Sequence, residues 1–221
     1  LLAGCLPSIV TKRATRLKFF YSPGSCALAT HITLAEVNAD YEPIRVDFGN
    51  VEQSADAYLA INPKGRVPAL VTDAGILTET PAILLYLAQC YPQAAIAPLA
   101  DPFALARVQA FNSYLCATVH VAHAHGARGH RWANEAASIA DMNAKVPETM
   151  AACLDLIEDE YIRGPWVMGD QFTICDPYLL TISNWLERDD VDRSLFPKVD
   201  AHAEMMMERP RTRAAWAEHF A

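Results

Sequence analysis

The sequence predicts two domains of different class, an α/β domain followed by an all-α domain. Nine of the fourteen prolines fall at or before Pro102, so the first half is divided into short elements and the second half can form long helices. Apolar residues form short runs in the first half, whereas they recur with helical spacing in the second. We therefore expect a leader or disordered extension over 1–15, the α/β domain over 16–92, a linker over 93–102 and a helical bundle over 103–221.

The first three elements of the α/β half predict a parallel strand pair. An apolar strand over 17–21 ends at a Ser-Pro-Gly turn over 22–24. Ser25 is a suitable N-cap for a helix over 26–37, and a strand with alternating side chains follows near 44–46. Because a helical crossover joins the two strands, they are expected to be parallel, with the right-handed connection that such units adopt.

The rest of this half predicts a hairpin and a closing helix. A short helix is expected over 55–61, and strands over 67–71 and 76–78 flank an Asp-Ala-Gly turn. Thr80 then caps a helix that has Pro81 at its first position. The predicted order is β-α-β-α-β-β-α.

The second half has three runs of apolar residues at helical spacing, which predict packed helices. A charged stretch over 187–193 is expected to form a solvated, salt-bridged turn. The apolar runs are 105, 108, 111, 115, 119 and 122; 150, 154, 157 and 161; and 174, 178, 182 and 186.

Composition excludes several classes of protein. The 221 residues include 18 Lys and Arg against 26 Asp and Glu, a formal charge of -8, which argues against a nucleic-acid partner. No apolar stretch approaches the roughly 20 residues that span a bilayer, so no integral membrane protein is expected. The six cysteines show no zinc-like spacing and no disulfide framework, which favours reduced thiols in a cytoplasmic protein.

The first five residues, Leu1 to Cys5, match the cleavage box of bacterial lipoproteins. The basic and apolar regions that precede such a box are missing from the sequence. We therefore interpret 1–15 as a leader or extension outside the fold.

Cys26 occupies a chemically distinct position at the predicted start of the first helix. Unpaired backbone N–H groups and the positive end of the helix dipole meet there, which predicts a lowered thiol pKa and stabilisation of a nearby anion. The alternative is a cysteine that only packs against the sheet.

Two further motifs have both a binding and a structural interpretation. A cis bond between Val67 and Pro68 would turn the Val67 backbone outward to pair with a peptide ligand, whereas an edge-strand proline is the ordinary alternative. Glu79 and Thr80 at a helix start can recognise the ammonium and carboxylate of an amino acid, or can merely cap the helix.

Together these motifs resemble one family. The segments YSPGSCALATHITL, NPKGRVPAL and LTETPAILLYLA resemble the glutathione transferases, most closely the bacterial beta class, over roughly 16–220. The resemblance implies a thioredoxin-like N-terminal domain, a C-terminal helical domain, glutathione as co-substrate and a homodimer.

The resemblance also assigns roles to residues of the N-terminal half. Cys26 would face the glutathione sulfur, and either its thiol or the Ser25 hydroxyl would donate a hydrogen bond to the thiolate. The glutathione-binding residues would be Arg66, Val67, Pro68, Glu79 and Thr80. Of these, Val67 and Pro68 would bind the cysteinyl backbone, and Glu79 and Thr80 the γ-glutamyl group.

The helical half also resembles the family, but some residues of the family pattern are replaced in this sequence. His120 aligns with a His-Lys pair near the active-site sulfur, but Val121 replaces the lysine. A second family lysine, which would meet the glycine carboxylate, falls at Val51, so that Arg66 or a partner subunit would have to replace it. The expected pocket for the electrophile is formed by Asn112, Cys116, His120 and His123. Four histidines occur between 120 and 130, but no supporting ligand spacing accompanies them, so no metal is expected.

Thr173 and Asp176 have the spacing of a capping box, in which each side chain bonds the other residue's backbone N–H. In the family this motif nucleates a buried helix. The expected role of Asp176 is therefore in folding.

The predicted activity is attack of the glutathione thiolate on small electrophilic substrates. Two alternatives remain open: a thiol transferase or peroxidase that uses Cys26 as nucleophile, and a non-catalytic scaffold of the same fold.

Overall fold

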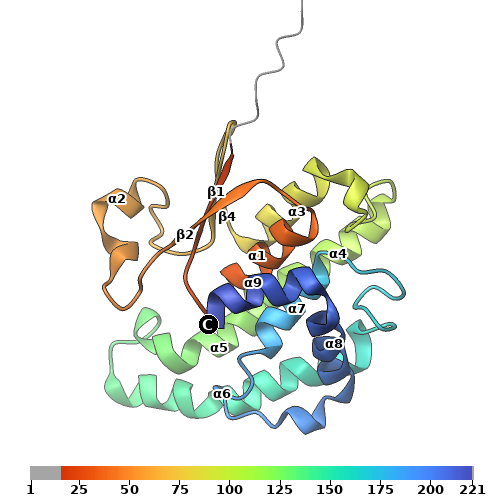
Figure 1. Cartoon of the computed structure of the whole chain (residues 1–221). Helices are drawn as coiled ribbons and strands as arrows, with labels where there is room; N and C mark the ends of the chain where they lie inside the picture. The colour runs from red at the N-terminus through yellow and green to blue at the C-terminus, as the bar shows by residue number, and fades with distance from the viewer. Residues whose placement is uncertain (1–15, 221) are drawn as a thin grey trace, which may run out of the picture.

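The computed structural model describes residues 16–220, and it consists of a thioredoxin-like domain followed by a helical domain (Figure 1). The sheet contains β1 (Leu17–Tyr21), β2 (Tyr41–Arg45), β3 (Ala69–Thr72) and β4 (Gly75–Thr78), in the order β2-β1-β3-β4. β1 and β2 are parallel, as expected from the crossover, and the other pairs are antiparallel.

Three α-helices and the 3₁₀ turn Glu52–Ser54 complete this domain; the α-helices are α1 (Ala27–Glu36), α2 (Asp56–Leu59) and α3 (Thr80–Cys90). β1 coincides with the expected strand. β2 begins three residues earlier than expected and includes Pro43, which is tolerated because β2 is an edge strand. Between α3 and the helical domain the chain forms one 3₁₀ turn, Pro92–Ala94.

The helical domain contains six α-helices in the described part of the chain. They are α4 (Pro102–Tyr114), α5 (His120–Arg128), α6 (Ala136–Leu156), α7 (Cys175–Ser183), α8 (Pro197–Glu208) and α9 (Pro210–Phe220). Asp101 caps α4 by accepting hydrogen bonds from the N–H groups of Phe103 and Ala104, both at 3.0 Å. A π-helical turn, Leu115–Val119, joins α4 to α5, so that the two form one long, locally widened helix. Within residues 16–220, no helix is both long and apolar enough to cross a membrane.

Helix α1 is the element that joins the two domains. All of its residues from Ala27 to Leu34 are buried, and it packs against α7 and α9 as well as against the sheet (Figure 1). The largest core cluster contains Ala29 and Leu84 from the first domain together with Phe111 and Tyr178 from the second. One continuous apolar core therefore fixes the start of α1, where Cys26 lies.

The start of α7 departs from the predicted capping box. The buried Asp176 carboxylate accepts from the Thr173 N–H at 2.6 Å and the Val167 N–H at 2.9 Å, and it contacts His202 Nε2 at 3.0 Å. The Thr173 hydroxyl accepts from the Cys175 N–H at 3.3 Å instead of from the Asp176 N–H, which bonds the Thr173 carbonyl. Half of the box forms, and Asp176 binds more donors than the motif predicts.

The stretch 187–193 is not the fully solvated turn that its charges suggest. Asp189 is 6% exposed and Val191 is likewise buried, whereas Arg193 pairs with Asp200 at 2.7 Å. Asp189 is buried because it has a partner in α5, described below.

Candidate active site

The turn between β1 and α1 places Cys26 at the edge between the domains. Gly24 has φ +67°, a conformation that favours glycine. The Ser25 hydroxyl donates to the Ser22 carbonyl at 2.6 Å and accepts from the Ala27 N–H at 3.3 Å. The N-cap position of α1 is Cys26 and not Ser25 as expected, because the helix begins at Ala27; the Ser25 hydroxyl is bonded within the turn.

The Cys26 thiol is half-buried and donates to the Val67 carbonyl at 3.4 Å. Burial raises the pKa of this thiol to about 11, although the Thr80 hydroxyl and the Arg128 guanidinium oppose the shift. The expectation of a lowered pKa is wrong, because desolvation outweighs the helix start and the neighbouring donors. At neutral pH the Cys26 side chain is a neutral hydrogen-bond donor.

The peptide bond between Val67 and Pro68 is cis, as the ligand-binding interpretation of this motif requires. The Arg66 carbonyl, one residue earlier, accepts from Tyr58 Oη at 2.7 Å and Asn62 Nδ2 at 2.6 Å, which holds the loop in place. Within the described residues, the Val67 N–H donates to no protein acceptor. The loop thus presents a free backbone donor beside Cys26.

Glu79 precedes α3 in a strained conformation, with φ 74° and ψ 119°. Its carboxylate forms an ion pair with Lys64 Nζ, which also donates to Thr78 Oγ1 at 2.6 Å. The prediction that Thr80 caps α3 is wrong: the cap position is Glu79, and Thr80 is buried at the first position of the helix. The loop lysine and the α3 start are thereby fixed together next to the Val67 loop.

The residues that are expected to form the electrophile pocket differ in their burial. Asn112 is fully buried in α4, and among the described residues its side-chain amide has no hydrogen-bond partner. Cys116 is partly exposed and within electrostatic range of Glu79, while burial raises the pKa of its thiol. His120 is mostly enclosed, and burial together with nearby cations lowers its pKa to about 4.

His123 is held by groups that sequence reasoning missed. Its Nδ1 lies 2.7 and 2.8 Å from the two carboxylate oxygens of the buried Asp189. Its ring stacks on Trp185 at 4.2 Å between centroids, and Trp185 Nε1 donates to the Gly24 carbonyl at 3.0 Å. Asp189, His123 and Trp185 therefore form a connected set of side chains that supports the turn between β1 and α1. The one feature of the sequence that could have indicated this set is the tryptophan itself, because the indole N–H of a buried tryptophan needs a hydrogen-bond acceptor.

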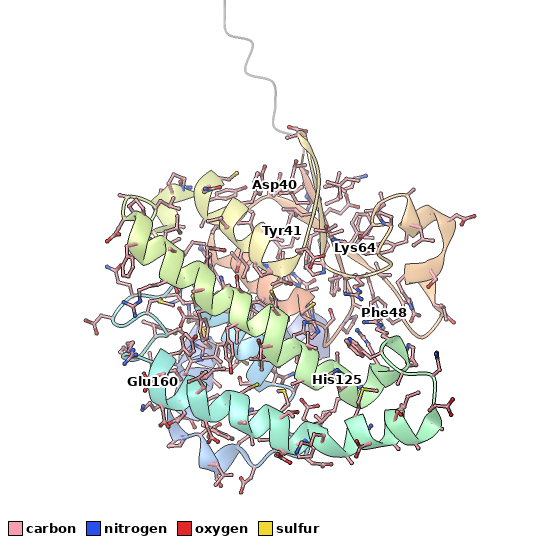
Figure 2. All side chains as sticks on the ribbon, turned by 180° about the vertical axis from the view of Figure 1, so that it is seen from behind. Asp40, Tyr41, Phe48, Lys64, His125 and Glu160 are labelled. Carbon is pink, nitrogen blue, oxygen red and sulfur yellow. The ribbon has the colours of Figure 1, made fainter. Side chains whose placement is uncertain are left out.

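A basic group also lies on this side of the molecule. Arg128 at the end of α5 is within electrostatic range of Cys26 and Arg66, and Arg131 is within range of both arginines. Figure 2 shows Phe48 and Lys64 of the first domain on the same side as His125 of α5, with Glu160 on the opposite side. Only Arg66 of these arginines was singled out from the sequence, because the other two belong to a helix end whose position depends on the fold.

The end of α9 packs against the same region. His219 Nε2 lies 3.1 Å from Nδ1 of the buried His31 in α1, and the two rings pack with Tyr21. Phe220 lies over the turn, since a Cβ on Gly24 would be 3.7 Å from its ring. Over residues 16–220, no group of three histidine, cysteine or acidic side chains is arranged to hold a metal ion.

The fold and the site define a thioredoxin-like protein whose helix start, cis-proline loop and α3 start face one another. A model of the glutathione S-transferase N-terminal domain matches residues 16–89, and one of the C-terminal domain matches residues 126–210. The chain belongs to the glutathione S-transferase family.

Individual relatives cover nearly the whole chain. It is 30% identical over 201 residues to the glutathione S-transferase GstA of Escherichia coli O157:H7, covering 90% of this chain and 96% of the relative. It is 29% identical to the maleylacetoacetate isomerase of Pseudomonas aeruginosa, covering 89% and 93%. A solved glutathione transferase homologue from Sulfitobacter, with bound glutathione, is 44% identical with a TM-score of 0.90, covering 93% of this chain and 99% of that one. The relatives thus include an isomerase as well as glutathione transferases.

Proposed function

We propose that this chain is a beta-class glutathione transferase that joins glutathione to small electrophilic substrates, acting as a homodimer in the cytoplasm. The observation that carries the proposal is the convergence of three binding elements: the free Val67 N–H, the Cys26 thiol and Glu79 at the start of α3. They match the backbone, the sulfur and the γ-glutamyl end of one tripeptide.

Cys26 acts as a hydrogen-bond donor to the glutathione thiolate. Because burial raises its pKa to about 11, the thiol keeps its proton at neutral pH and can transfer its hydrogen bond from the Val67 carbonyl to the bound sulfur. The positive end of the α1 helix dipole adds positive potential at the same place. A hydrogen bond to a charged sulfur contributes about 1.5–3 kcal/mol, which is roughly 10- to 100-fold in the fraction of thiolate.

Thiol transfer through Cys26 is less well supported. A nucleophilic cysteine must be a thiolate at working pH, and the raised pKa of Cys26 opposes this. A scaffold without glutathione binding is also disfavoured, since it gives the free Val67 N–H no role.

Isomerisation is the second candidate function. It is favoured by the basic group of Arg66, Arg128 and Arg131, together with the isomerase among the relatives. In that reaction glutathione adds to a double bond and leaves again, so that glutathione is not consumed. Loss of free thiol during turnover therefore distinguishes conjugation from isomerisation.

The test combines binding and turnover in the wild type and in Cys26→Ala. The wild type is expected to be retained on immobilised glutathione and to conjugate 1-chloro-2,4-dinitrobenzene. The alanine variant should still bind glutathione but conjugate roughly 10- to 100-fold more slowly at pH 6.5, where the thiolate is scarce. No binding at millimolar glutathione would overturn the proposal, and a mixed disulfide between Cys26 and glutathione found by mass spectrometry during turnover would favour thiol transfer.

A further inference from the structure

A cavity of about 500 Å³ lies between α5, α6 and the segment 188–190 that follows α7. Helices α5 and α6 pack against each other beside it (Figure 1). Its volume is within the range of pockets that hold small organic molecules. Every residue of its wall belongs to the helical domain, so the cavity is separate from the site formed by Cys26, Val67 and Glu79. The wall is mostly polar, and its polar side chains are His123, Asn143, Arg188, Asp189 and Asp190.

The carboxylate of Asp189 is buried in this wall and has few hydrogen-bond donors. Its side chain is 4% exposed, and within residues 16–220 its two oxygens contact a single donor atom, Nδ1 of His123, at 2.7 and 2.8 Å. The other two buried acidic residues of the described chain have more partners, since Asp176 contacts donors on three residues and Glu158 contacts donors on two. A carboxylate can accept about four hydrogen bonds, so Asp189 retains acceptor sites beside the cavity. Because a buried charge with too few donors costs free energy, a ligand with N–H groups is stabilised there.

The charged groups of the wall favour a positively charged ligand. Asp189 and Asp190 supply two carboxylates, whereas Arg188 supplies one guanidinium. Asn143 adds an acceptor, because its Nδ2 donates to the Gly126 carbonyl at 2.6 Å while its Oδ1 receives no hydrogen bond from the described residues. A ligand with several N–H groups can therefore bind Asp189 inside the cavity and the exposed Asn143 and Asp190 at its rim.

We propose that this cavity is a second ligand site, which binds a small organic cation with several N–H donors through the Asp189 carboxylate. A guanidinium or amidinium group is well suited, because its parallel N–H groups match the two oxygens of a carboxylate. The cavity shares no residue with the three elements that bind glutathione in the proposed function. The inference therefore goes beyond that function and does not depend on it.

A matched pair of probes tests this inference by calorimetry at pH 8. N-Butylguanidinium carries the charge, and N-butylurea has nearly the same shape without it. We expect the wild type to bind butylguanidinium at least about tenfold more tightly than butylurea. Asp189→Asn keeps an acceptor for His123 but removes the charge, so it should weaken binding of butylguanidinium by about tenfold and leave that of butylurea within about twofold. The control is Asp141→Asn, an exposed acidic position of α6 outside the cavity wall, which should bind both probes as the wild type does.

Should Asp189→Asn fold poorly, Ala144→Phe tests the cavity from an exposed position of its wall, where the larger side chain should fill the space and weaken binding of butylguanidinium by about tenfold. No binding at millimolar butylguanidinium, equal affinity for the two probes, or unchanged affinity in both variants would overturn the inference. The titration is repeated with S-(2,4-dinitrophenyl)glutathione, the conjugation product, at a saturating concentration. An affinity within about twofold supports a separate site, whereas displacement by the product would overturn it and assign the cavity to the electrophile. Absence of glutathione binding would refute the proposed function alone.

Discussion

The buried pair of His31 and His219 makes the stability of this protein sensitive to acid. Nδ1 of His31 lies 3.1 Å from Nε2 of His219, and both rings are neutral near pH 7 in the folded state because their pKa values are lowered. Burial lowers the pKa of His31 to about 4, and burial together with His31 lowers that of His219 to about 3. Glu218 lies 3.8 Å from His31 Nε2 but does not offset the burial.

The sign and size of the effect follow from proton linkage. In the unfolded chain both histidines titrate near pH 6.5, so below that pH the unfolded state binds more protons than the folded state, and the free energy of unfolding decreases. Above about pH 7.5 the stability is fully present. At pH 5 each histidine accounts for a loss of about 2 kcal/mol, or about 4 kcal/mol for the pair. His120, whose pKa is also lowered to about 4, adds to the loss.

Urea unfolding at pH 8 and at pH 5, at one fixed protein concentration, measures this loss. The double variant His31→Phe/His219→Leu replaces both partners by apolar groups and should retain only the part due to other groups, whereas His130→Gln, at an exposed position, should behave as wild type. If the double variant fails to fold, His219→Gln keeps a neutral partner for His31 and should remove about half of the pair's contribution. A loss of less than about 1 kcal/mol in the wild type, or an equal loss in the double variant, would contradict the proton linkage of this pair.

Three other substitutions test single contacts. Trp185→Phe keeps a ring against His123 but removes the donor to the Gly24 carbonyl. We expect the free energy of unfolding in urea to fall by about 1 kcal/mol and conjugation to slow, whereas an unchanged kcat would contradict a supporting role for the tryptophan. Asp176→Ala leaves buried donors without an acceptor and should cost about 4 kcal/mol in the same assay; a loss under 1 kcal/mol would show that water replaces the carboxylate. Glu79→Gln keeps the shape but removes the charge, so calorimetry should find glutathione binding weakened by about tenfold, and unchanged affinity would remove its role at the ammonium group.

The local features of the site could be predicted from the sequence because neighbouring residues create them. The strand and the Ser-Pro-Gly turn put Cys26 at a helix start, and Pro81 marks the start of α3. The thiol pKa of Cys26 could not be predicted, since it depends on how much protein surrounds the sulfur once α1 is packed.

The distant contacts could not be predicted because no short-range pattern encodes them. Trp185 and Gly24 are 161 residues apart, and His31 and His219 are 188 apart. No pattern in the sequence pairs His123 with Asp189, which holds its ring and belongs to a stretch expected to be solvated. A polar residue can be buried when it forms a hydrogen bond with a residue far along the chain. The local sequence predicts neither that partner nor the burial.

The continuous core around α1 has a consequence for how the molecule unfolds. Ala29 and Leu84 of the first domain lie in one cluster with Phe111 and Tyr178 of the second, so the linker separates the domains along the chain but not in the interior. Neither half can lose its structure without exposing the apolar surface of the other. The two domains should therefore melt in a single cooperative transition, and a fragment that ends near residue 92 should not be stable by itself, because α1 would lose the helices that cover its outer face.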